Sequence, residues 1–173
     1  MKIKSLIVTA AMVPMLSGCF ANQPDAEPCE TNIFNFRSKE EPLGSATDFD
    51  EAARTAAQGS APVTLGEVTR AAGWDDNWDR MFDVFLPTNS EKLYEQTQTN
   101  KNQICWKNWP EPLAIDDDHV PGGLYLFFAD DKPVQAVSWP FDQKFLSTKH
   151  LSELTPQTVL IPDPSGPKLV PAP

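Results

Sequence analysis

The residues best suited to bind a divalent metal ion are acidic side chains near the middle of the chain. Asp75, Asn77 and Asp79 occupy alternate positions, as at the start of a calcium-binding loop. That loop requires glycine at its sixth position and glutamate at its twelfth, where this sequence has Arg80 and Leu86. We therefore predict an acidic turn and no resident metal ion. Asp75, Asn77 and Asp79 are weak candidates for a looser oxygen-ligand site.

Residues that could act in catalysis are few. The two histidines, His119 and His150, lie in no recognisable catalytic motif, and the sequence has no G-x-S-x-G, H-E-x-x-H, P-loop or G-x-G-x-x-G pattern. The acidic run 116–119 is expected to be a solvated loop, because adjacent side chains on an extended chain point to opposite sides. Paired carboxylates need no local motif, since their separation is a property of the folded chain. We predict no cofactor and no catalytic residue, and carboxylate catalysis stays open as an alternative.

The first nineteen residues have the order of an export signal. Lys2 and Lys4 precede an apolar stretch, residues 5–15, which is shorter than the roughly 20 residues that span a bilayer. The sequence Leu16-Ser17-Gly18-Cys19 follows, and it resembles the lipobox of bacterial lipoprotein precursors. The resemblance implies a diacylglyceryl thioether on Cys19, cleavage before this residue, and acylation of the new amino terminus, for which palmitate is the expected acyl group.

Lipid on the mature terminus would place the protein on the extracytoplasmic side of the cell membrane. One acyl chain gives only marginal binding at about 0.8 kcal/mol per buried methylene, whereas two or three chains hold a protein at the surface. We therefore divide the chain into a signal peptide (1–18), a lipidated tether (19–28), a globular domain (29–160) and a proline-rich tail (161–173).

The cysteine count supports the same interpretation. Of the three cysteines, Cys19 is assigned to lipid, which leaves Cys29 and Cys105. Two cysteines in an exported domain are expected to pair. Closing this loop would stabilise the fold by roughly 4 kcal/mol in the chain-entropy model.

Composition limits the classes of partner. The chain has 173 residues, 40% of them hydrophobic, which is enough for one domain with a real core. Its formal net charge of -10 argues against nucleic acid, because phosphate binding needs clustered lysine and arginine. The expected partners are the membrane, through the lipid anchor, and a protein of the cell envelope.

Hydrophobic patterns and capping residues predict the elements of the domain. Helices are expected before a run of strands, and the clearest strands form a hairpin, which favours an α+β fold with an antiparallel sheet and helices packed on one face. The predicted helices are 49–58, 65–72 (with the capping-box residues Thr64 and Glu67) and 91–98; the predicted strands are 80–86, 103–107, 124–129 and 134–139.

The mature domain also has a weaker resemblance. The segments 78–85 and 87–91, followed by a leucine-rich hairpin that ends near Trp139, resemble small uncharacterised lipoprotein domains of bacteria over roughly residues 63–146. This resemblance implies no activity and no functional residue.

Tryptophans are the remaining candidates for ligand binding. Trp106 and Trp109 lie beside Cys105 and before Pro110, where partial exposure would let them line a sugar or peptide groove; most aromatic side chains on strands instead belong to the core. The sequence thus favours a non-catalytic, membrane-anchored binding module. The alternatives are an extracytoplasmic hydrolase that uses carboxylates and a small inhibitor or envelope-assembly accessory protein.

Replacing the lipid-bearing cysteine tests the anchor. Cys19→Ala is expected to release the protein from the membrane or to leave the precursor unprocessed, because the thioether cannot form. Membrane fractionation and mass spectrometry of the mature amino terminus measure both effects. Unchanged membrane retention and processing would contradict lipidation at this residue.

Overall fold

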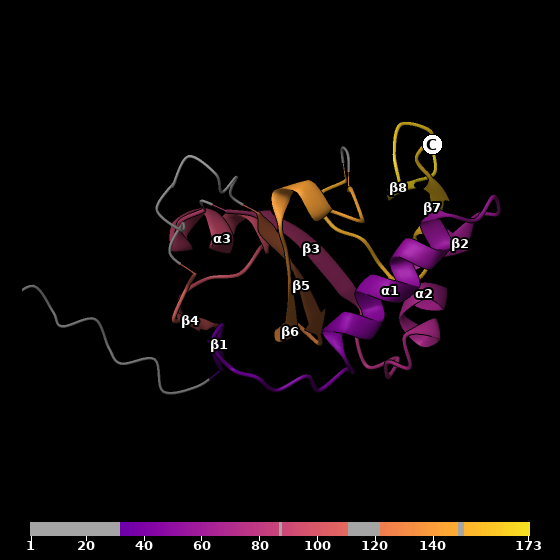
Figure 1. The fold of residues 1–173 in the computed structure, drawn as a ribbon. Helices are drawn as coiled ribbons and strands as arrows, with labels where there is room; N and C mark the ends of the chain where they lie inside the picture. The colour runs from indigo at the N-terminus through magenta and orange to yellow at the C-terminus, as the bar shows by residue number, and fades with distance from the viewer. Residues whose placement is uncertain (1–31, 87, 111–121, 149–150) are drawn as a thin grey trace, which may run out of the picture.

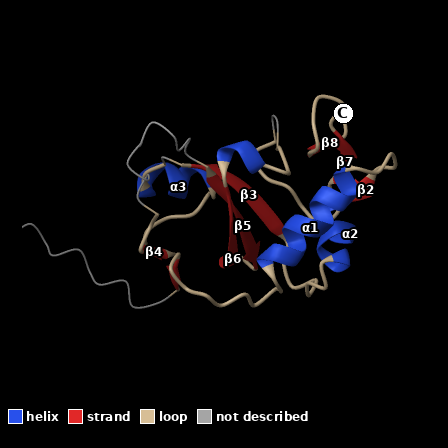
Figure 2. Ribbon diagram, viewed as in Figure 1, coloured by secondary structure: helices blue, strands red, loops and turns tan. Residues whose placement is uncertain are grey.

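The computed structural model describes residues 32–86, 88–110, 122–148 and 151–173. They form one small α+β domain with two antiparallel sheets and a short parallel pair of strands, which confirms the predicted α+β class (Figures 1 and 2). No helix in these ranges has the length and apolar character needed to cross a membrane. The elements are β1 (Ile33–Asn35), α1 (Ala46–Ala57), β2 (Val63–Thr64), α2 (Leu65–Ala71), β3 (Arg80–Phe85), α3 (Ser90–Gln96), β4 (Cys105–Lys107), β5 (Gly123–Ala129), β6 (Lys132–Trp139), the 3₁₀ helix η1 (Phe141–Gln143), β7 (Val159–Pro162) and β8 (Leu169–Pro171).

The central sheet has the strand order β3-β5-β6, and both pairs are antiparallel. A two-residue turn joins β5 to β6, formed by Asp130 and Asp131 with φ of 47° and 65°. The predicted strands 124–129 and 134–139 left a four-residue connection, 130–133, which is wrong because β6 begins at Lys132. Two aspartates accept the left-handed conformation that a tight hairpin turn requires, and Pro133 is tolerated inside β6 because this strand lies at the sheet edge.

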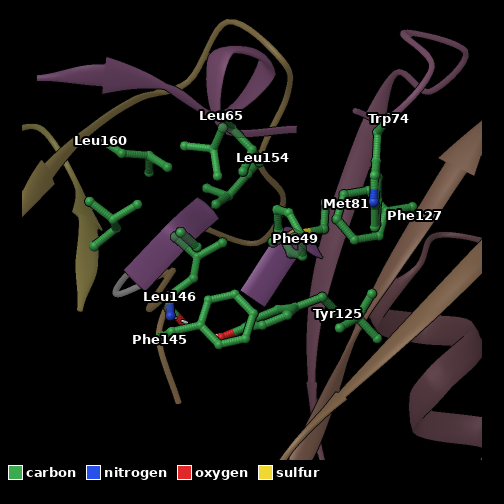
Figure 3. Close-up of a cluster of buried hydrophobic side chains, with 14 of the residues drawn as sticks. Phe49, Leu65, Trp74, Met81, Tyr125, Phe127, Phe145, Leu146, Leu154 and Leu160 are labelled. Atoms are coloured by element: carbon green, nitrogen blue, oxygen red, sulfur yellow. Dashed lines mark hydrogen bonds between the residues drawn. The ribbon is translucent and has the colours of Figure 1, made fainter. Parts of the chain in front are cut away.

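Strand β5 is buried on both faces. Tyr125 and Phe127 point into one hydrophobic cluster, where Phe49 of α1 packs at 5.5 Å from the Phe127 ring (Figure 3). Leu126 and its neighbours on the opposite face belong to a second cluster, which contains Leu93 of α3. Figure 1 shows α1 and α2 on one side of the sheet and α3 on the other, and the two hydrophobic clusters agree with this. The prediction that the helices pack on one face is therefore wrong, because β5 is apolar on both faces and needs a covering layer on each.

Capping residues fix where the helices begin. Thr64 and Glu67 form the predicted capping box at the start of α2, with each side chain accepting a hydrogen bond from the other residue's main-chain amide. Ser45 caps α1 by accepting from the Asp48 amide, so this helix begins at Ala46, three residues before the predicted start.

The carboxyl-terminal segment is part of the fold. The predicted extended tail, 161–173, contains β8 and the end of β7, which pair with each other and, through β7, with β2. Leu169 and Val170 are fully buried. The prediction of a separate tail is therefore wrong, because the apolar residues between the prolines are sufficient to join the core.

Tyr125 is the one polar side chain of β5, and it is fully buried. Its hydroxyl donates a hydrogen bond to the Leu146 carbonyl oxygen at 2.6 Å and accepts one from the Leu146 amide at 3.1 Å. Burial raises the pKa of Tyr125 far above its usual value, and the nearby Asp83 carboxylate raises it further. Partial burial also raises the pKa of Tyr94, the only other tyrosine.

This burial predicts how the protein responds to alkali. A raised phenol pKa contributes stability that is present below the ordinary tyrosine value of about 10 and is lost as pH rises above it. Titration followed by tyrosinate absorbance is expected to show Tyr125 ionising only as the fold is lost, whereas both tyrosines ionise near pH ~10 in denaturant. Reversible ionisation of both phenols near that pH with unchanged circular dichroism would contradict the burial of Tyr125.

Candidate functional site

Some of the candidate residues predicted from the sequence lie within the described ranges and some lie outside them. Cys19, Cys29, the run 116–119 and His150 lie outside the described residues. Lipidation at Cys19 therefore stays a prediction, and so does the pairing of Cys29 with Cys105.

The neighbourhood of Cys105 makes that pairing geometrically reachable. Strand β4 runs parallel to β1, with Cys105 opposite Ile33, and the Cys105 amide donates to the Asn32 carbonyl oxygen at 3.0 Å. Cys29 precedes Ile33 by four residues, which span at most about 14 Å of chain. A disulfide needs Cα atoms roughly 4.4–6.8 Å apart, well within that reach.

Trp106 and Trp109 lie together in an aromatic cluster beside the β1–β4 pair. Phe36 separates them, with its ring 5.7 Å from the Trp106 ring and 4.7 Å from the Trp109 ring. Both tryptophans are half-buried against the second core cluster, and the Trp109 indole nitrogen donates to the Thr88 carbonyl oxygen. Their ring contacts are those of core aromatic residues, and neither residue lines the hollows described below.

The predicted acidic turn does not gather its side chains. The Asp79 carboxylate accepts a hydrogen bond from the Asp130 amide, so it supports the β5–β6 turn. Asp75 and Asn77 are exposed, and no group of three potential metal ligands occurs among the described residues.

Two hollows follow the outer edge of β6. The first, of about 270 Å³, lies between β1 with the loop after it and residues 133–136 of β6. The second, of about 410 Å³, lies between α1 and residues 136–139. Ala136 lines both hollows, so together they follow β6 from Pro133 to Trp139. We call this stretch the β6 edge.

The loop between β1 and α1 is attached to the β6 edge by one side chain. The Gln135 amide group accepts a hydrogen bond from the Leu43 amide at 2.9 Å and donates one to the Gly44 carbonyl oxygen at 2.8 Å. Because Gln135 is 2% exposed, both bonds are shielded from water. The loop is thereby held at the side of the strand by side-chain contacts.

The main chain of β6 has no partner on its outer side among the described residues. Strand β6 ends the sheet, and no hydrogen bond joins its main chain to a described residue other than those of β5. In an antiparallel strand, alternate residues direct their N–H and C=O groups away from the neighbouring strand. These groups form an unused pairing template about seven residues long, which is the feature that an added strand recognises.

The most deeply buried carboxylate among the described ion pairs lies on β3. The Asp83 side chain is 6% exposed; one of its oxygens is 2.5 Å from the Lys144 ammonium and 3.3 Å from the Thr148 hydroxyl. The Lys144 ammonium also lies 4.3 Å from the centre of the Trp139 ring. The Asp83 carboxylate is thus paired with a cation. Its contacts with Lys144 and Thr148 hold the segment after β6 against β3.

The sequence predicted neither the open β6 edge nor the Asp83–Lys144 ion pair. Asp83 was included in a predicted strand, but no local pattern marks the residue sixty-one positions away that neutralises it. The bare edge could be inferred only from the order of strands in the sheet. The hydrophobic run 124–129, apolar on both faces, was the one available signal, because it predicted that β5 is central.

No protein-family model, curated protein or solved structure matches this chain.

Thiol labelling tests the predicted disulfide. In the mature protein, denatured without reduction, a thiol reagent is expected to label no cysteine, because Cys29 and Cys105 are paired and Cys19 carries lipid. Reduction before labelling should expose two thiols. Two reactive thiols in the non-reduced protein would contradict the pairing.

Proposed function

We propose that this chain is a lipid-anchored, non-catalytic interaction module on the extracytoplasmic side of the membrane, and that it binds an extended segment of a partner protein along the β6 edge. The observation that carries the proposal is the outer main chain of β6, which no strand of the described residues covers and which lies along two hollows. Main-chain hydrogen bonds supply affinity in this mode of recognition, and the hollows select side chains.

The shape of the β6 edge supports an added strand better than a small ligand. Its two hollows are arranged end to end along the strand, and residues 133–139 would span about 23 Å at ~3.3 Å per residue. An extended peptide alternates its side chains, so those on one face could enter the hollows while the main chain pairs with β6. Lys132 and Pro133 at the start of the strand limit pairing there, which leaves the remainder as the favoured segment.

The described carboxylates support a non-catalytic role. A glycosidase-like site needs two carboxyl groups, one of them with a raised pKa so that it can donate a proton. Asp83 is paired with Lys144, and Asp50, which lines the second hollow, is held by Arg54 in an ion pair at 2.9 Å. Both carboxylates are thus engaged by a cation, and we assign both to structure.

A tether suits an interaction of this kind. The segment from Cys19 to Asn32 spans at most about 45 Å when fully extended, which would keep the domain near the membrane surface. Confinement raises the effective concentration of the domain for a partner in the same envelope, so a modest intrinsic affinity is sufficient.

Photo-cross-linking in intact cells tests the proposal. A photoreactive amino acid at Ser138, which is exposed and lines the second hollow, is expected to give a discrete adduct with one envelope protein. The same group at Glu95, an exposed residue of α3, is the matched control and should not give this adduct.

The partner segment that is cross-linked to Ser138 then gives the sequence of a peptide that can be tested as a competitor. A synthetic peptide with the sequence of that segment is expected to abolish the Ser138 adduct when added in excess, and its scrambled version should not. An identical adduct from Glu95, or a Ser138 adduct that both peptides leave unchanged, would contradict binding at the β6 edge.

A further inference from the structure

A third hollow, separate from the β6 edge, lies between α1 and α2. It has a volume of about 640 Å³ and is the largest of the described hollows. Its floor consists of small apolar side chains, among them Ala52 and Ala56 of α1 and Val68 of α2, and Ala71 of α2 lines the groove from an exposed position. Side chains this short leave the two helix backbones accessible, so a rod-like segment with apolar side chains could pack between them.

Three carboxylates form the rim of this α1–α2 groove. Asp48 and Glu51 project from α1 and Glu67 from α2, all three are exposed, and no lysine or arginine lines the groove. Asp48 and Glu67 each lie in the first turn of their helix, where an acidic residue interacts favourably with the helix dipole. Hydrogen bonds from Thr64 hold the pKa of Glu67 below its usual value, so this rim charge persists at mildly acidic pH.

Glu51 is the rim residue without a structural explanation. It lies past the first turn of α1, and its carboxylate makes no hydrogen bond or ion pair with another described residue. The Glu51 carboxylate therefore adds to the negative potential of the groove. The net charge of the chain, -10, has the same sign.

We propose that the α1–α2 groove binds an amphipathic helix of a partner protein, with the apolar face of that helix on the alanine floor and lysine or arginine side chains beside the rim carboxylates. The geometry matches helix-in-groove recognition, in which anchors at i, i+3, i+4 and i+7 enter an apolar cleft. The charge of the rim selects a basic partner and steers its approach. The same charge disfavours anionic lipid, nucleic acid and a second copy of this acidic chain.

The test uses a defined probe. A fluorescent peptide of about 18 residues, or roughly five helical turns, carries leucine at the i, i+3, i+4 and i+7 positions and lysine elsewhere; its matched counterpart carries glutamate in place of lysine. Fluorescence polarisation with the full chain in a non-ionic detergent measures the dissociation constant. The lysine peptide is expected to bind and to weaken as salt is raised, and the glutamate peptide is expected not to bind.

Variants of the groove and matched surface controls decide the location. Glu51→Lys is expected to weaken binding of the lysine peptide about tenfold, whereas Glu95→Lys, the same change on α3, should leave it unaltered. Ala71→Phe fills the groove from an exposed position and is expected to remove binding, whereas Gln96→Phe on α3 should not. Thermal unfolding of each variant verifies that the fold is retained.

Three outcomes would overturn the proposal. Equal weakening by Glu51→Lys and Glu95→Lys would show that the peptide responds to net charge alone. Tight binding by the glutamate peptide, or by the lysine peptide to a correctly folded Ala71→Phe variant, would show that the groove is not the site. None of these outcomes bears on the β6 edge, which these substitutions do not touch.

Discussion

The burial of β5 on both faces is the constraint on which the rest of the structure depends. Its six consecutive buried residues, Gly123–Phe128, need apolar partners above and below the sheet as well as a strand on each side. One face is covered by the cluster around Phe49 and the other by the cluster around Leu93. Each buried aromatic or leucine side chain contributes about 1.5–3 kcal/mol, so neither covering layer is dispensable.

This arrangement determines where the sheet stops. Strands β3 and β6 satisfy the main chain of β5 on either side, and β6 then becomes an edge, since the chain after Trp139 turns into η1 instead of adding a fourth strand. The Asp83–Lys144 pair reinforces that turn by joining β3 to the segment that follows η1. The core therefore both builds the sheet and exposes the edge that we propose as the functional surface.

Two surfaces with different chemistry result from the same packing. The β6 edge offers main-chain groups, and it favours an extended partner. The α1–α2 groove offers short apolar side chains with a negative rim, and it favours a basic helix. The lipid anchor proposed at Cys19 would give both surfaces a fixed location, which is how a small domain without a catalytic centre can act in an envelope.

The sequence predicted those parts of the fold that local patterns determine. The capping box of α2, the strand formers of β3 and the apolar run of β5 each carry their signal within a few residues, and all three elements occur as predicted. Strands β7 and β8 were missed because prolines interrupt their short apolar segments, and because β2, which pairs with β7, lies about a hundred residues earlier. The tight Asp130–Asp131 turn was missed because aspartates adopt a positive φ only when the strands around them demand it.

The candidate site was beyond local patterns for the same reason. A bare edge is defined by which strands are absent beside it, and a groove is defined by two helices from separate segments. The tryptophans that drew attention in the sequence instead pack into clusters, because large aromatic side chains contribute most to a core when they are buried.

Amide hydrogen exchange of the free protein tests the central claim most directly. If β5 is enclosed on both sides and β6 is an open edge, all β5 amides exchange slowly, while the amides of β6 alternate between slow and fast along the strand. Uniformly slow exchange across β6, at the level of β5, would show that another strand already covers this edge and would contradict the account.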